Sequence, residues 1–181
     1  MIIYILLGLA ILLGFYGISI YNRLVRMRNE AEEAFKTIDV FLKQRYDLIP
    51  NLINTIKGYT AYESSTLEKI VNLRSQAMSA APAEKGASEA ALAGALKSVF
   101  ALAENYPDLK ASQEFLHLQE TLTNLEESIQ RARRYYNATV RDLSTAIESF
   151  PNNLFAGALG FQKMEYFDVP QNETQNVDVR F

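Results

Sequence analysis

Two residues with the spacing of a metal site stand out in this sequence, Glu114 and His117, three positions apart on a predicted helix. A glutamate and a histidine at this spacing form half of the carboxylate-bridged di-iron sites found in helical bundles. A complete site needs two such pairs and two more inward glutamates, but the sequence contains one histidine. Neither residue shares the apolar seam of Leu118 and Leu122. We therefore interpret His117 as facing solvent and predict no metal and no other cofactor.

The densest polar group near an apolar seam surrounds a proline. It comprises Lys43, Arg45, Tyr46, Asp47, Pro50, Asn51, Asn54 and Tyr59. One hypothesis is functional: a kink at Pro50 opens a groove that binds a peptide or a partner protein. The alternative is structural, with Arg45 paired to an acid of the third predicted helix and the asparagines bonded to carbonyls that the proline leaves free. We favour the structural alternative, because buried polar groups beside a proline need such partners.

The composition disfavours several classes of enzyme and of nucleic-acid-binding protein. The sequence has no cysteine, which excludes disulfides, a thiolate nucleophile and cysteine-bound zinc. It has one histidine, no nucleophile elbow and no glycine-rich phosphate loop, so neither a hydrolytic triad nor a nucleotide site is indicated. Once Arg23, Arg26 and Arg28 are set aside from the 18 basic residues, 15 remain against 21 acids, which disfavours DNA or RNA binding. We therefore expect a protein that is not an enzyme.

Residues 1–21 form an uncharged apolar segment with the length of a transmembrane helix. About 20 residues at 1.5 Å each cross a bilayer core of ~30 Å. A cleavable signal peptide would have a positive n-region, a shorter apolar run and a cleavage site of small residues. Here Gly14, Gly17 and Ser19 alternate with large apolar side chains, which makes a poor cleavage site. We predict that the segment is retained as a membrane anchor.

The charges that flank this segment predict its orientation. Arg23, Arg26 and Arg28 follow it directly, and no lysine or arginine precedes it. Because the positive end of a span normally stays in the cytoplasm, we expect a short N-terminus outside the cell and a cytoplasmic body. The alternative is that the three arginines extend to lipid headgroups on whichever side they lie.

Apolar residues recur in steps of three and four from residue 22 to Ala77, which predicts one very long helix. The pattern has gaps only at Arg45 and Glu63. It keeps its phase across Pro50, so we interpret this proline as a kink inside the helix. The alternative is a new helix that Asp47 caps, with Pro50 in its first turn.

The remaining pattern predicts two more helices. Residues 80–88 contain Pro82 and Gly86 among small residues and are predicted to form a loop. A second helix follows from a cap at Ser88 to near Glu104, and a turn at 105–108 starts a third that ends near Phe150. Beyond these two, Pro151 can start a short terminal helix through Leu154 and Ala158. We expect the two long helices to pack antiparallel in an all-α, three- to four-helix bundle. The predicted domains are the anchor at 1–21, the bundle at 22–160 and an extended tail at 161–181.

Several stretches of this sequence resemble the LemA family. They are residues 21–25, 28–29, 38–52, 57–59, 66–68, 104–111, 115–116, 118–119, 132–133, 136–137 and 150–151. The most specific is Arg-Tyr-Asp-Leu-Ile-Pro-Asn-Leu at 45–52, and the matches extend over nearly the whole chain. One departure is Phe35, where the family pattern leads us to expect Trp; a phenylalanine can fill the same buried site. The resemblance implies an N-terminally anchored helical bundle with a short extracellular end and no established catalytic activity. One branch of the family resembles a magnetosome-formation protein, which suggests a role in organising membranes.

We therefore expect a non-enzymatic, single-pass scaffold of the bacterial cell membrane that binds lipid, self-associates as a homo-oligomer or recruits unknown membrane or envelope proteins. The basis for self-association is a pair of apolar seams too long for one short second helix to cover. The first alternative is a signalling domain that senses a peptide or ligand through the polar group around Pro50. The less favoured alternative is a metal-dependent enzyme.

Overall fold

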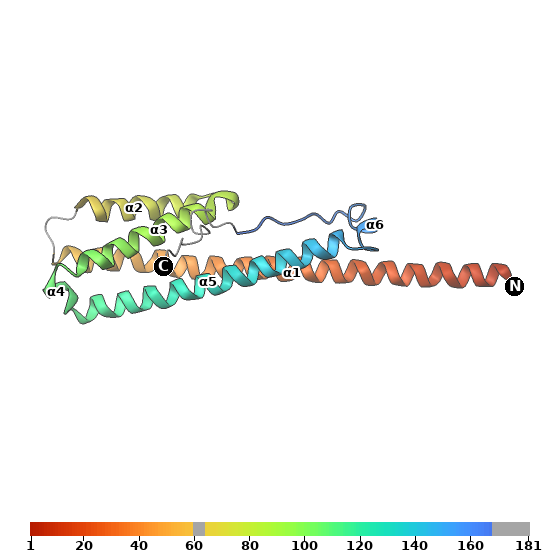
Figure 1. Cartoon of the computed structure of the whole chain (residues 1–181), viewed down its shortest axis with the longest axis horizontal. Coiled ribbons are helices and arrows are strands. Elements are labelled where there is room, and N and C mark those ends of the chain that lie inside the picture. The colour runs from red at the N-terminus through yellow and green to blue at the C-terminus, as the bar shows by residue number, and fades with distance from the viewer. Residues whose placement is uncertain (60–63, 168–181) are drawn as a thin grey trace, which may run out of the picture. The chain divides into compact units, whose positions relative to one another are not determined.

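The computed structural model describes residues 1–59 and 64–167, which form mostly helices (Figure 1). The helices in this part are α1 (Ile2–Lys57), α2 (Ser64–Ser79), α3 (Pro82–Ala103), α4 (Pro107–Lys110), α5 (Gln113–Glu148) and α6 (Asn153–Ala156). No strand occurs among the described residues. The prediction of an all-α fold, in which an N-terminal apolar helix continues into a helical bundle, is confirmed.

The first helix is a continuous element of 56 residues, but it is shorter than predicted. The prediction of one helix reaching Ala77 is wrong, because α1 ends at Lys57. The amide of the next residue, Gly58, donates to the carbonyl of Thr55 at 3.2 Å. A Cβ added at Gly58 would lie only 3.3 Å from that carbonyl oxygen, which favours glycine where the helix ends. The gap predicted at Glu63 lies outside the described residues.

The path of α1 at Pro50 decides between the two interpretations of this proline. The helix continues through Pro50, so the alternative of a new helix capped by Asp47 is wrong. Pro50 is exposed, whereas the seam beside it is buried. The seam's buried residues here are Ile38, Leu42, Ile49, Leu52 and Ile56. The proline therefore lies on the outer side of the helix, where its ring does not interrupt the packing.

The loop predicted at residues 80–88 is wrong, because α3 already begins at Pro82. A proline in the first turn of a helix lacks only an amide that would be unpaired anyway. Gly86 lies inside α3 and is buried. The hydroxyl of Ser88 donates to the carbonyl of Glu84 within the helix, so Ser88 is not its cap.

The third predicted helix is interrupted near its start. The turn at 105–108 leads into α4, as predicted, and the chain breaks again at residues 111–112 before α5 begins. The amide of Phe115 donates to the hydroxyl of Ser112 at 3.4 Å, which caps the new helix. A short helix after Pro151 was also predicted, and it corresponds to α6.

The described residues divide into two compact units. The first comprises Met1–Thr37 and Ala132–Tyr166. In it the α1 and α5 segments run antiparallel, and the core contains Ile20, Leu24, Leu143, Ala146, Ala156 and Phe161. Phe161 meets the ring of Tyr21 edge-on, with centroids 5.7 Å apart. Residues 161–166 are neither helix nor strand, and the buried Phe161 holds this part of the predicted tail against the unit.

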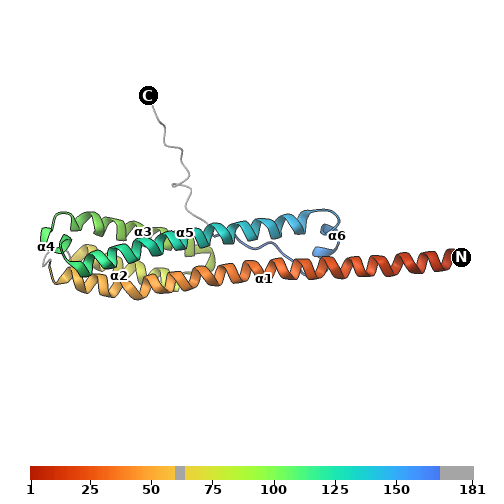
Figure 2. The same ribbon diagram turned by 90° about the horizontal axis from the view of Figure 1, so that it is seen from below.

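The second unit comprises Ile38–Arg131 and Phe167–Phe181, of which Phe167 is the last described residue. Its α1 and α5 segments lie with α2 and α3 in a bundle (Figure 2). Apolar residues that the four helices bury include Leu42, Ile49, Ile70, Leu92, Leu96, Val99, Leu122 and Ile129. Two helices, α2 and α3, therefore cover the seam for which one short helix was expected.

Candidate functional site

The buried centre of the second unit holds charged side chains. Arg45 of α1 is 1% exposed, and its Nη1 donates to Glu126 Oε2 of α5 at 2.6 Å. Its Nη2 donates to Glu89 Oε2 of α3, and the Tyr46 hydroxyl donates to the other oxygen of Glu89. Buried charges require such partners, because an unpaired ion in the interior is strongly destabilising. The predicted pairing of Arg45 with an acid of a later helix is confirmed by its contact with Glu126.

Glu89 is the member of this network that sequence reasoning missed. The predicted cap at Ser88 places Glu89 in the first turn of a helix, where a glutamate is usually exposed. A signal was nevertheless present: Glu89 precedes Leu92, Leu96 and Val99 in steps of three and four, so it lies on their seam. Arg45 also occupies a seam position. Opposite charges on two apolar seams indicate a buried ion pair.

The environment of Tyr46 shows what this network does chemically. Burial raises the pKa of the Tyr46 hydroxyl above its usual value of 10.0, while the neighbouring charge of Arg45 opposes the rise. The phenol therefore stays protonated at neutral pH and donates its hydrogen to Glu89. This makes Tyr46 a hydrogen-bond donor rather than a base, and the network is suited to hold three helices together.

The carbonyl that Pro50 leaves free has a partner from another helix. Proline has no amide hydrogen, so the carbonyl of Tyr46, four residues earlier, loses its helical donor. Arg74 Nε of α2 donates to this carbonyl at 2.8 Å. The expectation that Asn51 and Asn54 would serve this carbonyl is thus wrong, since an arginine from a distant part of the sequence does so.

The polar group predicted around Pro50 is divided between the interior and the surface. Only Arg45 and Tyr46 are buried, and the other six members are exposed. Lys43 Nζ and Asp47 Oδ2 form a surface ion pair at 2.8 Å, one helical turn apart. The eight residues therefore do not form one site.

Part of the exposed group lines a groove between α1 and α5 within the second unit. This groove has a volume of about 610 Å³, and Asp47 and Asn51 face Thr121 and Asn124 across it. Asn51 also lines a smaller pocket of about 310 Å³ with Asn54, Thr55 and Glu114. These short amide, hydroxyl and carboxylate side chains offer hydrogen-bond donors and acceptors to a peptide or another helix.

A third cavity lies beside the buried ions. It is about 230 Å³, and Leu96, Phe100 and Leu122 give it apolar walls, with Arg45 and Glu126 at one side. Ligand pockets usually measure about 300–1,000 Å³, so this cavity is small for an organic cofactor. Both polar residues are already bonded to each other.

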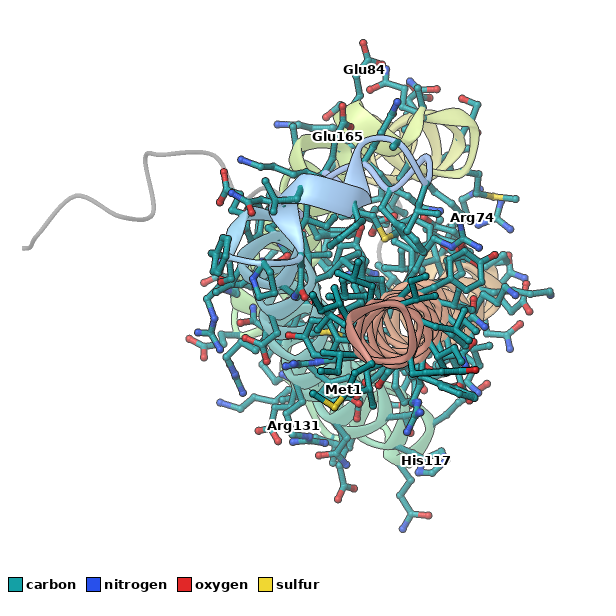
Figure 3. All side chains as sticks on the ribbon, turned by 90° about the vertical axis from the view of Figure 1, so that its right-hand side faces the viewer. Met1, Arg74, Glu84, His117, Arg131 and Glu165 are labelled. Carbon is teal, nitrogen blue, oxygen red and sulfur yellow. The ribbon has the colours of Figure 1, made fainter. Side chains whose placement is uncertain are left out.

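The pair Glu114 and His117 does not form part of a cluster. Both side chains are exposed, and Figure 3 shows His117 pointing away from the helices. Across residues 1–59 and 64–167, no group of three or more His, Cys, Asp or Glu side chains is arranged to hold a metal ion. The interpretation of His117 as solvent-facing is confirmed.

The N-terminal part of α1 has the properties of a membrane span. It is the only helix in the described residues that is long and apolar enough to cross a bilayer, and no residue of its most apolar window is buried. Arg23, Arg26 and Arg28 follow it and are all exposed. The guanidinium of Arg28 lies 5.6 Å from the centre of the Phe161 ring, close enough for a cation–π contact. The three arginines thus lie on the surface next to the apolar segment.

Known proteins resemble this chain over most of its length. The sequence profile of the LemA family matches residues 34–181. Protein LemA of Metamycoplasma hominis is 29% identical over 162 residues, covering 87% of this chain and 73% of that protein. Magnetosome protein MamQ of Magnetospirillum gryphiswaldense is 24% identical over 182 residues, covering 85% and 67% respectively. Magnetosome protein MamQ 2 of Paramagnetospirillum magneticum is 23% identical with the same coverage.

Proposed function

We propose that this chain, which belongs to the LemA family, is a non-enzymatic scaffold that a single membrane span holds at the cytoplasmic face of a bacterial cell membrane. In this role its helical domain self-associates or gathers membrane or envelope proteins. The chain's similarity to a protein named magnetosome protein MamQ supports a role in organising membranes.

One observation carries this proposal: the apolar segment and the domain share one helix. α1 runs from Ile2 to Lys57 without interruption, so the exposed apolar part and the buried seam from Ile38 onward belong to the same helix. Large exposed apolar surfaces on soluble domains are unfavourable, and a lipid bilayer is the environment that this length of helix fits. A tether of this kind fixes the domain close to the membrane.

Arg23, Arg26 and Arg28 support the cytoplasmic location of the domain, because positive charges at the end of a span are retained on the cytoplasmic side. Orientation is tested with single cysteines, which are unique labels because the sequence has none. We expect a membrane-impermeant maleimide to label I2C in intact spheroplasts and S65C only after lysis. Labelling of S65C before lysis would show that the protein has the opposite orientation.

The groove between α1 and α5 supports the proposed interaction with partners. Asp47, Asn51, Thr121 and Asn124 line an open surface that carries both donors and acceptors. A photo-crosslinking residue at Asn51 should yield adducts with a second copy or with a membrane protein, and the same residue at the exposed Lys69 of α2 is the matched control. A strict monomer in mild detergent, without adducts from position 51, would contradict the scaffold.

A second candidate function is recognition of a peptide or small ligand in this same groove. It is supported by the position of Asn51, which lines both the groove and the adjoining pocket. The double variant N51A/N124A removes two exposed side chains that line the groove, so it should remain folded. If the groove binds a ligand, cells that carry the folded variant should behave like cells that lack the protein. Cells that instead behave like those with the native protein would exclude this function.

A further inference from the structure

An uncharged segment follows α5 and exposes large apolar side chains. No charged residue occurs in 149–162. Phe150, Leu154, Phe155 and Leu159 are 80%, 64%, 42% and 45% exposed. Single exposed apolar residues are ordinary on protein surfaces, but four within ten positions form a patch that marks an interaction site.

This segment lies beside the end of the membrane span within the first unit. Phe150 and Pro151 line one pocket with Tyr16 of α1, and the charged Arg23 and Asp142 lie at the same pocket. Ala156 belongs to the same core cluster as Ile20. Figure 2 shows α6 next to α1, with the N-terminal part of α1 extending beyond it. The patch therefore flanks the last turns of the apolar segment at residues 1–21.

The depth of this position in a bilayer follows from helix geometry. Tyr16 precedes residue 21, where the apolar segment ends, by about 7.5 Å at 1.5 Å per residue. Interfacial elements bury their apolar faces about 5–10 Å into the boundary between headgroups and acyl chains. A side chain level with Tyr16 would therefore reach this boundary if the span crosses the membrane.

The backbone of the segment suits an environment with little water. Amides from Asn153 to Ala156 donate to carbonyls of residues 149–152, and the amide of Phe161 donates to Ala156. The side chain of Asn152 is buried, and its Nδ2 donates to the carbonyl of Ala146 at 2.9 Å. Such internal bonding matters because an unsatisfied backbone group in lipid costs several kcal/mol.

Charged residues lie on either side of the apolar patch. Lys163 forms an ion pair with Glu148, so the two charges nearest the patch in the sequence are joined to each other. Arg28 lies over the ring of Phe161, at the end of the uncharged segment. Charges of this kind remain at the headgroups or in water while apolar neighbours enter the lipid.

We propose that residues 150–160, here called the apolar wedge, insert into the cytoplasmic leaflet beside the span and form a second contact with the lipid. This inference rests on the proposed function, because it requires α1 to cross the membrane. The wedge occupies the level at which the span meets lipid, and it is uncharged. The surface that covers the wedge is therefore lipid rather than a second copy of the chain.

The test measures the depth of single fluorophores in the full chain. The variants L154C, L12C and S65C carry an environment-sensitive label and are reconstituted in phosphatidylcholine–phosphatidylglycerol vesicles that contain brominated lipids. L12C reports the span, and S65C reports an exposed position of the second unit. We expect the L154C label to emit at shorter wavelength than the S65C label. Bromines near the headgroup end of the acyl chains should quench it more than bromines near the terminal methyl.

The outcomes distinguish a failure of the wedge proposal from a failure of the membrane anchor. If L12C is quenched and L154C behaves like S65C, the wedge is excluded and the anchor stands. If L12C is not quenched, the anchor itself is excluded, and the wedge falls with it. If the unlabelled L154C variant forms disulfide dimers under oxidation and the labelled variant resists quenching, a second copy covers the patch, which also overturns the lipid contact.

Discussion

The two units differ in the chemistry of their cores. The residues that the first unit buries carry no charge: they are mainly apolar and aromatic, such as Ile20, Leu24 and Phe161, with a few neutral polar ones such as Asn152. The second buries Arg45 and Glu89 as well as aliphatic side chains. Apolar packing tolerates substitution as long as volume is kept, whereas a buried ion pair demands a particular partner on each helix. We infer that the ions of the second unit specify which residues of α1, α3 and α5 meet.

The largest expected effect comes from removing the central charge of the second unit. R45M leaves Glu89 buried without its arginine, which should lower the free energy of unfolding by about 3–5 kcal/mol. The double variant R45M/E89M should recover part of this loss, because it removes both members of the buried pair but leaves Glu126 and the Tyr46 hydroxyl without their partners. Denaturant unfolding in mild detergent measures both effects. If R45M were as stable as the native protein, the second unit would not depend on its buried ion pair, and the proposed difference between the units would be wrong.

The matching variant of the first unit removes an aromatic side chain. F161A should lower the free energy of unfolding by about 3 kcal/mol, because it leaves a cavity beside Tyr21 and Leu24. Hydrogen exchange should locate the increased opening in residues 1–37 and 132–166. Equal loss of protection in α3 would show that the two cores open together rather than separately.

The Tyr46 hydroxyl gives the second unit a dependence on pH. Y46F removes a hydrogen bond to a buried carboxylate and should cost about 2 kcal/mol at neutral pH. The native pKa lies above the value of 10.0 in the unfolded chain, so the hydroxyl's contribution is complete below pH 10 and declines as pH rises through the native pKa. The stability difference between native protein and Y46F should therefore narrow above pH 10. A difference that widens there would contradict this assignment.

The smallest effect is expected at the surface of the second unit. Lys43 and Asp47 are paired but exposed, so K43M should change the free energy of unfolding by less than about 0.5 kcal/mol. Thermal unfolding of K43M beside R45M compares an exposed with a buried charge only two positions apart. A loss for K43M as large as that for R45M would show that burial does not decide the effect.

Much of the architecture follows from local patterns in the sequence. The apolar steps of three and four identify α1 and α5, and the absence of charge identifies the apolar segment at the start of α1. The boundaries between the helices were harder to predict. Pro82 and Gly86 have the composition of a loop, yet Pro82 stands in the first turn of α3 and Gly86 is buried inside the same helix. Such positions depend on what other segments of the chain place next to them.

The candidate site could be predicted only in part for the same reason. Arg45 interrupts an apolar seam, and this alone indicates a buried partner. Its second partner, Glu89, and the donor to the Tyr46 carbonyl, Arg74, come from helices whose register the sequence does not specify. The apolar wedge was recognised only as a helix stop followed by a short helix, because the exposure of its side chains depends on how the segment folds against α1.

The most direct test of the anchored helix is alkaline extraction of native membranes, combined with the intact mass of the recovered chain. We predict that the full-length protein remains in the membrane pellet and that its mass includes the apolar segment. Recovery of a folded, competent chain in the soluble fraction, lacking about 20 N-terminal residues, would contradict a span that stays joined to the helical domain.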